Sequence, residues 1–529
     1  MRSLLIPLLL VTPLVAAPPY PPEPLKGSLV IVGGGKMPDA ARDEFVKLAG
    51  GPEKAKIVVI PTASTMADEP KEREAFLKPW KDAKCGSVLV LHTRDRKQAD
   101  SEEFVKAIAD ATGIWFGGGD QTKLTAAYRG TAVETAIRKR LEHGIVIGGT
   151  SAGAAVMSDL MIEGGAEAAK TGPGFGFLPG VVVDQHFTQR KREKRLAGVI
   201  GANPTYAGLG IDEGTAVILT GGRLMTVVGD GAATVVLGKS PLRPALADPV
   251  KAGGTIDLFQ IRRAAHFRSL KDQFPAKTAA VPEVPKGSLV IVGGGGMGPD
   301  LWDKFLELAG GKDEPIVFVA TAGDDPIRAE PGEVRMLKAR GASNVIVLHT
   351  RDRKVADTDE FSKPLTTATG VWFSGGRQWR FVDAYEGTLT EKRFREVLAR
   401  GGVIGGSSAG ASIQSEYMPR GHPLGNTVVA AEGYERGFGF LPGCAVDQHF
   451  FARKRTADMT GLMTRYPQLL GIGLDEGTAI VVTGHTAEVI GKSKVGFYDY
   501  RSPPNDDAKD YVEVPAGGRY DLKERKVAK

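Results

Sequence analysis

The sequence feature that most constrains the fold of this chain is a long internal duplication. Residues 145–153 read IVIGGTSAG and residues 402–410 read GVIGGSSAG. Two further motifs follow each segment in the same order: DQHF at 184–187 and 447–450, then IDEGTA at 211–216 and LDEGTA at 474–479. The 529 residues leave room for two domains of about 240 residues each. We therefore expect two copies of one domain, whose residues can be compared with each other.

The two copies have clear boundaries. Both begin with the same segment, KGSLVIVGGG, at Lys26 and at Lys286. The stretch 271–285 between them, KDQFPAKTAAVPEVP, has the composition of a linker. The sequence thus predicts one domain over residues 26–270 and a second over residues 286–529.

Within each copy, short apolar and β-branched runs alternate with segments of helical periodicity. In the first copy SLVIV, KIVVIP, SVLVLH, GIWF and GIVIGG are such runs, and DEFVKLAG and SEEFVKAIAD lie between them. Apolar strands separated by amphipathic helices are typical of a parallel sheet covered on both faces. We predict the α/β class, as two tandem doubly wound domains with mostly parallel sheets. The turn-rich ends of the copies, from Gly221 and Gly484, predict an antiparallel extension that closes each sheet.

Charge and cysteine content exclude several function classes. The net charge at pH 7 is only +6 and the basic residues are spread among acidic ones, so nothing requires a nucleic-acid partner. Cys85 and Cys444 are the only cysteines and occupy non-equivalent positions, which is no disulfide framework. Cys444 is best explained as a small buried apolar residue. No HExxH motif or paired Cys/His spacing indicates a metal, and we expect no cofactor.

The segment 1–17 has the pattern of a secretory signal. Arg2 precedes an apolar stretch from Leu4 to Val15, and the small residues Ala16 and Ala17 follow. An apolar stretch of about 12 residues is short for a membrane span, which needs roughly 20. We expect export to the periplasm or the medium, with cleavage after Ala16 or Ala17 and no membrane attachment afterwards.

The repeated GTSAG and GSSAG segments have the GxSxG form around Ser151 and Ser408. Each lies after a predicted strand and before a helix-compatible run, which is the setting of a nucleophile elbow. Glycines on either side would let the chain turn sharply enough for the serine Oγ to project outward. An ordinary strand-to-helix turn gives the same pattern, so the motif alone does not decide.

A nucleophilic serine needs a base, and a neutral imidazole suits this role at neutral pH. Of the eight histidines, only two pairs occupy matching positions, His92 with His349 and His186 with His449. The first pair ends two predicted strands, where local hydrogen bonds would satisfy it. We favour His186 and His449, which lie in the polar DQHF cluster downstream of the serine.

The third member of such a triad is a carboxylate that orients the imidazole. Glu213 and Glu476 follow the favoured histidines at the same spacing in both copies. Asp212 and Asp475 precede them and fit the spacing equally well, and an ordinary turn with two solvated acids is also compatible. Spacing alone leaves the choice open.

Together, the serine elbow, the GFGFLPG…DQHF segment and the DEGTA segment resemble the cyanophycinase family, and more broadly the peptidases that include aspartyl dipeptidase. The resemblance covers residues 26–260 and 286–525. It implies a class I glutamine-amidotransferase-like α/β fold and Ser-His-Glu triads. Carried over by position, the triads are Ser151, His186 and Glu213, and then Ser408, His449 and Glu476.

The resemblance implies acyl transfer to serine from a peptide or cyanophycin-like substrate containing aspartyl residues. Oxyanion donors would be the N–H groups of Ala152 and Gly118, and of Ala409 and Gly375 in the second copy. Arginines can bind substrate carboxylates bidentately, although a solvated basic helix face would look the same. The implied substrate-binding residues are Gln121, Asp184, Gln185, Arg190, Arg192 and Arg195, and then Gln378, Asp447, Gln448, Arg453 and Arg455.

The copies differ beside these groups. Asp120 becomes Arg377, and Arg195 becomes Asp458, so an acid and a base exchange places. We hypothesise an ion pair across each pocket wall, Asp120 with Arg195 and Arg377 with Asp458. Because the second copy departs from the GGDQ pattern, we expect the first copy to be the better catalyst.

Two other functions fit parts of the sequence. GGGGMG at residues 293–298 has the GxGxxG form of a dinucleotide-binding turn, but the first copy has Pro38 at the third glycine position, which favours a plain tight turn. A non-catalytic binding protein on the same fold is the other alternative. A non-catalytic protein would not need a serine, an imidazole and a carboxylate in the same order in both copies. Two fused domains could also pack as an intrachain pseudo-dimer, or the chain could form a homo-oligomer.

Overall fold

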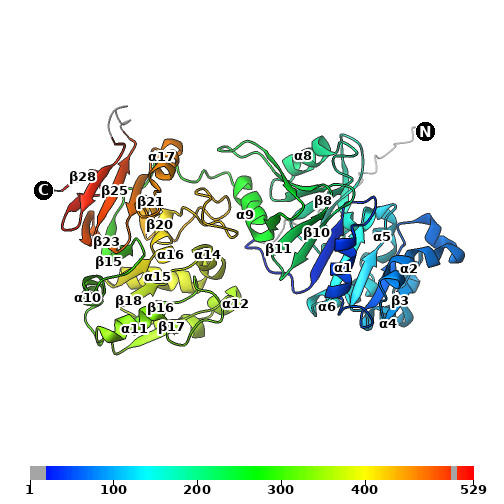
Figure 1. Ribbon diagram of the computed structural model, residues 1–529, viewed down its shortest axis with the longest axis horizontal. Coiled ribbons are helices and arrows are strands. Elements are labelled where there is room, and N and C mark those ends of the chain that lie inside the picture. The colour runs from blue at the N-terminus through cyan, green and yellow to red at the C-terminus, as the bar shows by residue number, and fades with distance from the viewer. Residues whose placement is uncertain (1–19, 502–508, 529) are drawn as a thin grey trace, which may run out of the picture. The chain divides into compact units, whose positions relative to one another are not determined.

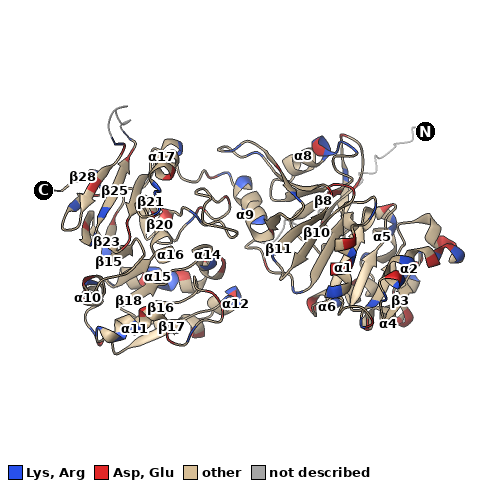
Figure 2. Ribbon diagram, viewed as in Figure 1, with Lys and Arg blue, Asp and Glu red and all other residues tan. Residues whose placement is uncertain are grey.

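The computed structural model describes residues 20–501 and 509–528 (Figure 1). These fall into two compact units that divide between Lys271 and Asp272. The predicted signal segment, residues 1–17, lies outside the described residues. No described helix has the length and apolar character needed to span a bilayer. Basic and acidic residues are interspersed over both units (Figure 2), as their distribution along the sequence predicts.

The first unit is built around an eight-stranded open sheet. Five parallel strands form one part of it, in the order β3, β2, β4, β5, β1, and three antiparallel strands, β10, β11 and β14, continue the sheet beyond β1. The strands are β1 (Ser28–Val32), β2 (Lys56–Ile60), β3 (Ser87–Val90), β4 (Gly113–Phe116), β5 (Val146–Thr150), β10 (Thr215–Thr220), β11 (Leu224–Gly229) and β14 (Thr255–Asp257). The predicted α/β class and antiparallel extension are confirmed, but the extension leaves the sheet open instead of closing it.

Helices cover both faces of this sheet, which is why β1 is apolar at every core position. Leu29 and Ile31 pack with helices on one face, while Val30 and Val32 pack with helices on the other. The helices of the unit are α1 (Asp39–Leu48), α2 (Arg73–Asp82), α3 (Arg96–Ala99), α4 (Glu102–Ala109), α5 (Gln121–Tyr128), α6 (Ala132–Glu142), α7 (Ala152–Ala155), α8 (Glu193–Ala202) and α9 (Leu258–Ser269), with short 3-10 turns at Thr65–Asp68 and Pro70–Glu72. Such two-sided coverage is the doubly wound arrangement.

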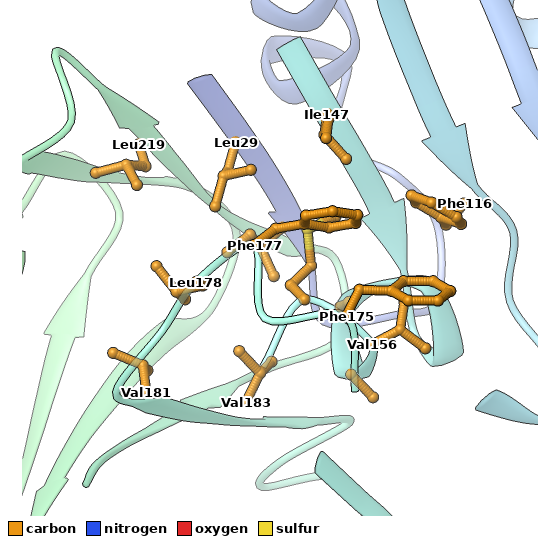
Figure 3. Packing of buried hydrophobic residues seen from close by; sticks show 14 of the residues in the cluster. Leu29, Phe116, Ile147, Val156, Phe175, Phe177, Leu178, Val181, Val183 and Leu219 are labelled. Carbon is orange, nitrogen blue, oxygen red and sulfur yellow. The ribbon is translucent and has the colours of Figure 1, made fainter. Parts of the chain in front are cut away.

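A second, four-stranded sheet, which the sequence did not predict, carries part of the site. Its order is β13, β12, β9, β8, and β8 runs parallel to β9. The core between the two sheets holds Phe175 and Phe177 against Leu29 of β1 and Val183 of β8 (Figure 3). The strands are β8 (Val181–Gln185), β9 (Ala207–Ile211), β12 (Ala232–Leu237) and β13 (Leu246–Lys251), beside a hairpin of β6 (Leu160–Gly164) and β7 (Lys170–Pro173). This core fixes β8 relative to the main sheet.

The second unit repeats this plan. Its main sheet has the order β17-β16-β18-β19-β15-β23-β24-β27-β28, and its smaller sheet β20-β21-β22-β25-β26. The strands are β15 (Val284–Val292), β16 (Ile316–Val319), β17 (Val345–Leu348), β18 (Gly370–Phe373), β19 (Val403–Ser407), β20 (Ser415–Tyr417), β21 (Leu441–Asp447), β22 (Leu470–Leu474), β23 (Thr478–Gly484), β24 (Thr486–Gly491), β25 (Lys494–Asp499), β26 (Val512–Pro515), β27 (Arg519–Asp521) and β28 (Lys526–Val527). The helices are α10 (Pro299–Leu308), α11 (Gly332–Ala339), α12 (Arg353–Ala356), α13 (Asp359–Ser362), α14 (Trp379–Tyr385), α15 (Leu389–Ala399), α16 (Ala409–Ser412) and α17 (Thr456–Arg465), with a 3-10 turn at Lys363–Thr366.

Most of the predicted linker is part of the second unit. Phe274 stacks on Tyr417 with 6.0 Å between ring centroids, and the Arg436 guanidinium lies over the Phe274 ring. Gln468 donates from Nε2 to the Ala276 carbonyl at 2.9 Å. Residues 271–285 were predicted to be a linker because of their proline and alanine content, but the apolar Phe274 anchors the segment in the second unit.

Candidate active sites

Each GxSxG serine lies in a strained turn directly after a central parallel strand. Ser151 follows β5 with φ of 51° and ψ of −109°, and Ser408 follows β19 with φ of 55° and ψ of −109°. A non-glycine residue adopts a positive φ of this kind only where its surroundings enforce it. The flanking glycines are required by contact: a Cβ at Gly149 would lie 2.4 Å from the Gly153 carbonyl oxygen, and one at Gly153 would lie 2.1 Å from that of Phe116. The motif is therefore a nucleophile elbow in geometry.

The histidine and glutamate of each site follow the strands of the smaller sheet. In β8 and β9, Gln185 pairs with Ile211, so the residues just beyond these strands leave the sheet side by side. His186 Nε2 lies 2.8 Å from Ser151 Oγ, and His186 Nδ1 lies 2.5 Å from Glu213 Oε1. The structure thus joins the three side chains that the family resemblance implies into one hydrogen-bonded chain.

The second unit repeats the chain with nearly the same distances. His449 Nε2 lies 2.9 Å from Ser408 Oγ, and His449 Nδ1 lies 2.6 Å from Glu476 Oε1. Both histidines have a positive φ, 49° for His186 and 50° for His449. The same strained backbone in both copies indicates that the imidazole position is enforced by the fold.

The glycine turn after β1 enforces that position, a role that sequence reasoning missed. The Gly33 carbonyl accepts from the His186 N–H at 2.7 Å, and the Gly34 carbonyl accepts from the Gly214 N–H at 3.0 Å. A Cβ at Gly34, whose φ is 112°, would lie 2.3 Å from His186 Cε1. In the second unit a Cβ at Gly294 would lie 2.4 Å from His449 Cε1. Two glycines of the GxGxxG pattern are also explained by the site, because a Cβ at Gly293 would lie 2.2 Å from the Asp475 carbonyl oxygen and one at Gly295 would lie 2.8 Å from Glu476 Cβ. The identity of KGSLVIVGGG in both copies was the available signal.

The two acids of each DEG turn have separate tasks. Glu213 meets the imidazole, whereas Asp212 accepts from the Thr188 N–H at 3.1 Å and from the Ala232 N–H at 3.1 Å. Asp212 thereby ties the loop that carries His186 to the start of β12. In the second unit Asp475 accepts from the Ala452 N–H at 3.0 Å. In both copies the glutamate, and not the aspartate, forms a hydrogen bond with the imidazole.

The alternative histidines stabilise loops away from the serines. His92 lies 2.9 Å from Thr62 Oγ1 through Nδ1 and 3.0 Å from Asp68 Oδ1 through Nε2. His349 makes the equivalent contacts with Thr321 and Asp325. Both ring nitrogens are satisfied locally.

Burial favours the neutral form of the site imidazoles. It lowers the pKa of His186, an effect that the hydrogen bond to Glu213 opposes and the charge of Arg190 reinforces. The pKa of His449 is lowered in the same way, with Glu476 opposing and Arg453 reinforcing. A lowered pKa favours the neutral imidazole at pH 7, which is the form that can accept the serine proton.

The predicted oxyanion donors lie next to the serines. Ala152 is the first residue of α7, so its N–H has no acceptor within the helix. A Cβ at Gly118 would lie 3.5 Å from Ser151 Cβ, and one at Gly375 would lie 3.8 Å from Ser408 Cβ. The two backbone segments therefore flank the serine side chain, as an oxyanion hole requires.

Comparison with known proteins identifies the family of this chain. The description "Peptidase family S51" matches residues 29–227 and again residues 289–490. The chain belongs to peptidase family S51. It is thus a serine-type peptidase with two S51 domains in tandem.

Curated relatives of this S51 chain include two cyanophycinases. The protein of Geminocystis herdmanii is 32% identical over 227 residues, which cover 41% of this chain and 82% of that protein. The protein of Thermosynechococcus vestitus is 36% identical over 222 residues, which cover 40% of this chain and 68% of that protein. Among solved structures, a peptidase from an acI-B1 Actinobacterium is 26% identical, with a TM-score of 0.37, and the match covers 44% of this chain and 97% of that one.

Some residues predicted to bind substrate are instead buried in the S51 domains. Asp184 is fully buried and accepts two hydrogen bonds from Arg195, one of them at 2.9 Å, while Arg192 reaches it at 3.4 Å. Arg195 is 4% exposed. The prediction of substrate contacts is wrong for Asp184 and Arg195, because the carboxylate at the end of β8 needs buried cations to compensate for its lost hydration.

The second S51 domain stabilises its corresponding carboxylate with a different arginine. Asp447, also buried, accepts from Arg420 at 3.0 Å and from Arg455 at 3.0 Å. Substrate contact is therefore wrong for Asp447 and Arg455 as well. Arg420 was missed, since it lies in a loop after β20 where the copies differ in length; Asp458 accepts from it at 2.6 Å.

The hypothesised ion pairs across the pocket walls are wrong. Asp120 caps α5 by accepting from the Thr122 N–H at 2.9 Å, and Arg195 is committed to Asp184. Arg377 donates to the His422 carbonyl at 2.9 Å. A helix N-cap and a buried cluster thus account for the charges that appeared to exchange between the copies.

Three of the other residues predicted to bind substrate are glutamines that form hydrogen bonds within their own domain. Gln121 donates from Nε2 to the carbonyls of Ile162 and Glu163, and Gln378 donates to those of Pro419 and Arg420, so both hold the loop beside the site. Gln448 Oε1 accepts from Arg455.

Within the described part of the chain, Gln185 and two arginines have side-chain polar atoms without a hydrogen-bond partner. Gln185 is 5% exposed and its Oε1 has no partner among the described residues. Arg190 and Arg453 are exposed and close enough to the site histidines to lower their pKa. The exposed Arg190 and Arg453 therefore remain candidates for contact with substrate, whereas Gln185 Oε1 is buried like the groups of Arg195 and Arg455.

Proposed function

We propose that each S51 domain hydrolyses aspartyl peptide bonds of the β-Asp-Arg or isoaspartyl type through a Ser-His-Glu triad and an acyl-enzyme. The observation that carries the proposal is the complete chain of hydrogen bonds from Ser151 through His186 to Glu213, present a second time at Ser408. The names of the cyanophycinase relatives support the choice of bond.

The steps follow from the geometry of the first domain. His186 Nε2 accepts the Ser151 proton as Oγ bonds to the scissile carbonyl carbon, and the carbonyl oxygen becomes an oxyanion facing the N–H groups of Ala152 and Gly118. The C–N bond then breaks, and His186 gives its proton to the leaving amine. Water attacks the acyl-serine, with His186 accepting its proton and returning it to Oγ. Glu213 holds Nδ1–H throughout and stabilises the imidazolium.

An acidic substrate fits the charge beside the triads. Arg190 and Arg453 present exposed guanidiniums next to the histidines, and a guanidinium can bind a carboxylate through two parallel hydrogen bonds. In a β-aspartyl dipeptide the α-carboxylate of the aspartyl residue is free while its side chain forms the scissile bond. We propose that these arginines bind that carboxylate.

Peptide hydrolysis by the full-length chain tests the proposal. Purified protein is incubated with cyanophycin and with a panel of β-aspartyl and α-aspartyl dipeptides, and the products are separated by liquid chromatography. The variants are Ser151→Ala, Ser408→Ala and both together, with Ser87→Ala, an exposed serine of β3, as the matched control. We expect the double variant to lose more than about 10³-fold in rate.

Two results would contradict the proposal. If the double variant keeps the activity of the Ser87→Ala control, the triads are not the catalysts. If the chain cleaves none of the peptides and a fluorophosphonate labels neither serine, a non-catalytic binding protein becomes the better interpretation.

We also propose that the chain is exported and loses an N-terminal segment that ends at Ala16 or Ala17. The support is the sequence pattern of a basic residue, an apolar stretch and two alanines. Cell fractionation and N-terminal sequencing of the native protein test this. Full-length protein retained in the cytosol with Met1 at its N-terminus would refute it.

A further inference from the structure

The Gly375 N–H, which lies beside Ser408, already has an acceptor in the second domain. It donates to Oε1 of Glu333 at an N–O distance of 3.4 Å. Glu333 is in the first turn of α11 and is half-buried. Burial raises the pKa of this carboxyl, while the Gly375 N–H works in the opposite direction. A side-chain carboxyl of the chain itself thus occupies one of the two expected oxyanion donors.

The described residues of the first domain offer no such acceptor. Counting back along the chain from the matched histidines His349 and His92, the position of Glu333 corresponds to that of Phe76 in α2. Phe76 packs against the apolar cluster that covers one face of the main sheet. Within the described ranges 20–501 and 509–528, the Gly118 N–H, the counterpart of Gly375, forms no hydrogen bond. The two domains therefore differ at one donor of an otherwise matched site.

This difference affects catalysis in a defined way. An oxyanion hole works because its N–H groups are free and point to the place where negative charge develops. A carboxylate bound to one of them removes that donor, and its own charge repels a second negative charge in a poorly solvated site. Loss of one oxyanion donor costs about 10²- to 10³-fold in kcat.

We infer that Glu333 competes with the reaction's oxyanion for the Gly375 N–H and thereby makes the second active site the slower one. This rests on the proposed function, because it takes Ser408 to be a working nucleophile. The effect falls on kcat more than on KM, since the oxyanion is present only at the transition state.

The test isolates the second site in a full-length chain that carries Ser151→Ala. Glu333→Phe, which copies the first domain, removes both the acceptor and the charge. Glu333→Gln keeps an acceptor and removes the charge. Glu330→Gln, a change at an exposed glutamate that pairs with Lys338, is the matched control. We expect at least about a tenfold rise in kcat for Glu333→Phe, a smaller rise for Glu333→Gln, and no change for the control.

The reciprocal change is made at the first site, in a chain that carries Ser408→Ala. Phe76→Glu should lower kcat by about tenfold or more, with KM little changed. Thermal unfolding and fluorophosphonate titration of Ser151 show whether that variant is folded and how many sites it retains. The rate is then expressed per titrated site, so that misfolding is not mistaken for inhibition.

The outcomes separate this inference from the proposed function. Activity of the second site that is unchanged or lowered by Glu333→Phe, while the first site works normally, overturns the role of Glu333. A second site that stays inactive in Glu333→Phe overturns it too, since relief of the competition should restore turnover. Loss of activity from every chain, including Ser408→Ala, would instead overturn the proposed hydrolase function.

Discussion

Replacing Arg195 by methionine should strongly destabilise the first domain. The guanidinium is 4% exposed and makes two hydrogen bonds to Asp184, whose carboxylate has no exposed surface. Methionine fills much of the same space but carries no charge. Among the described residues, the variant therefore leaves Arg192, at 3.4 Å, as the one remaining cation beside the buried carboxylate.

The magnitude follows from that geometry. Removing one partner of a buried ion pair typically costs about 3–5 kcal/mol, because the other charge stays buried and uncompensated. Since Arg192 still compensates part of the charge, we expect the lower end, about 3 kcal/mol. For a domain of this size each kcal/mol lowers Tm by about 2–4 °C, so the transition of the first domain should fall by about 6–12 °C.

Differential scanning calorimetry of the full-length chain measures this, because each domain can give its own transition. Lys194→Met, at the exposed neighbour of Arg195 on α8, is the control and should shift Tm by less than about 2 °C. Adding Asp184→Leu to Arg195→Met should recover part of the loss by removing the second charge. A fall in Tm no larger than that of the control, or a double variant less stable than the sum of the single ones, would refute the electrostatic reasoning.

Three further predictions concern the first site and the thiols. Gly34→Ala should abolish first-site turnover, measured with the second serine changed to alanine, because its Cβ would overlap the His186 ring; retained turnover would show that the turn is adaptable. The acid limb of kcat/KM for the first site should lie below the ordinary histidine pKa of about 6.5, because burial lowers the pKa of His186. Glu213→Gln should move this limb to still lower pH and reduce the rate, since the carboxylate raises the pKa of His186. A shift to higher pH would contradict this reasoning. In the native chain a thiol reagent should modify Cys85 but not the fully buried Cys444, and denaturant should expose both; equal native reactivity would contradict the burial.

The sequence was sufficient where one residue type at one position is needed. Ser151 and His186 each follow a buried strand directly, and the turns that hold them need glycine at fixed positions, so both copies retain the same letters. The pairing of the smaller sheet could not be predicted, because strands such as β13 are largely exposed and lack an apolar pattern. Glu333 escaped notice because its role depends on where α11 packs, and nothing in the local sequence of the helix encodes the approach of Gly375.

The buried carboxylates show why comparing the two copies position by position misleads for charged residues. Gln121 and Gln378 donate to equivalent loop carbonyls, those of Glu163 and Arg420, so these two residues occupy equivalent positions in the two domains. Between the domains an acid and a base therefore exchange at two places at once, Glu163 for Arg420 and Arg195 for Asp458. Either arrangement supplies a guanidinium to the aspartate that precedes the Gln-His pair of each candidate site. The physical requirement is a compensating charge in that space, and any chain segment that reaches the space can meet it, whereas the geometry at Ser151 can be met only by the residue at that position.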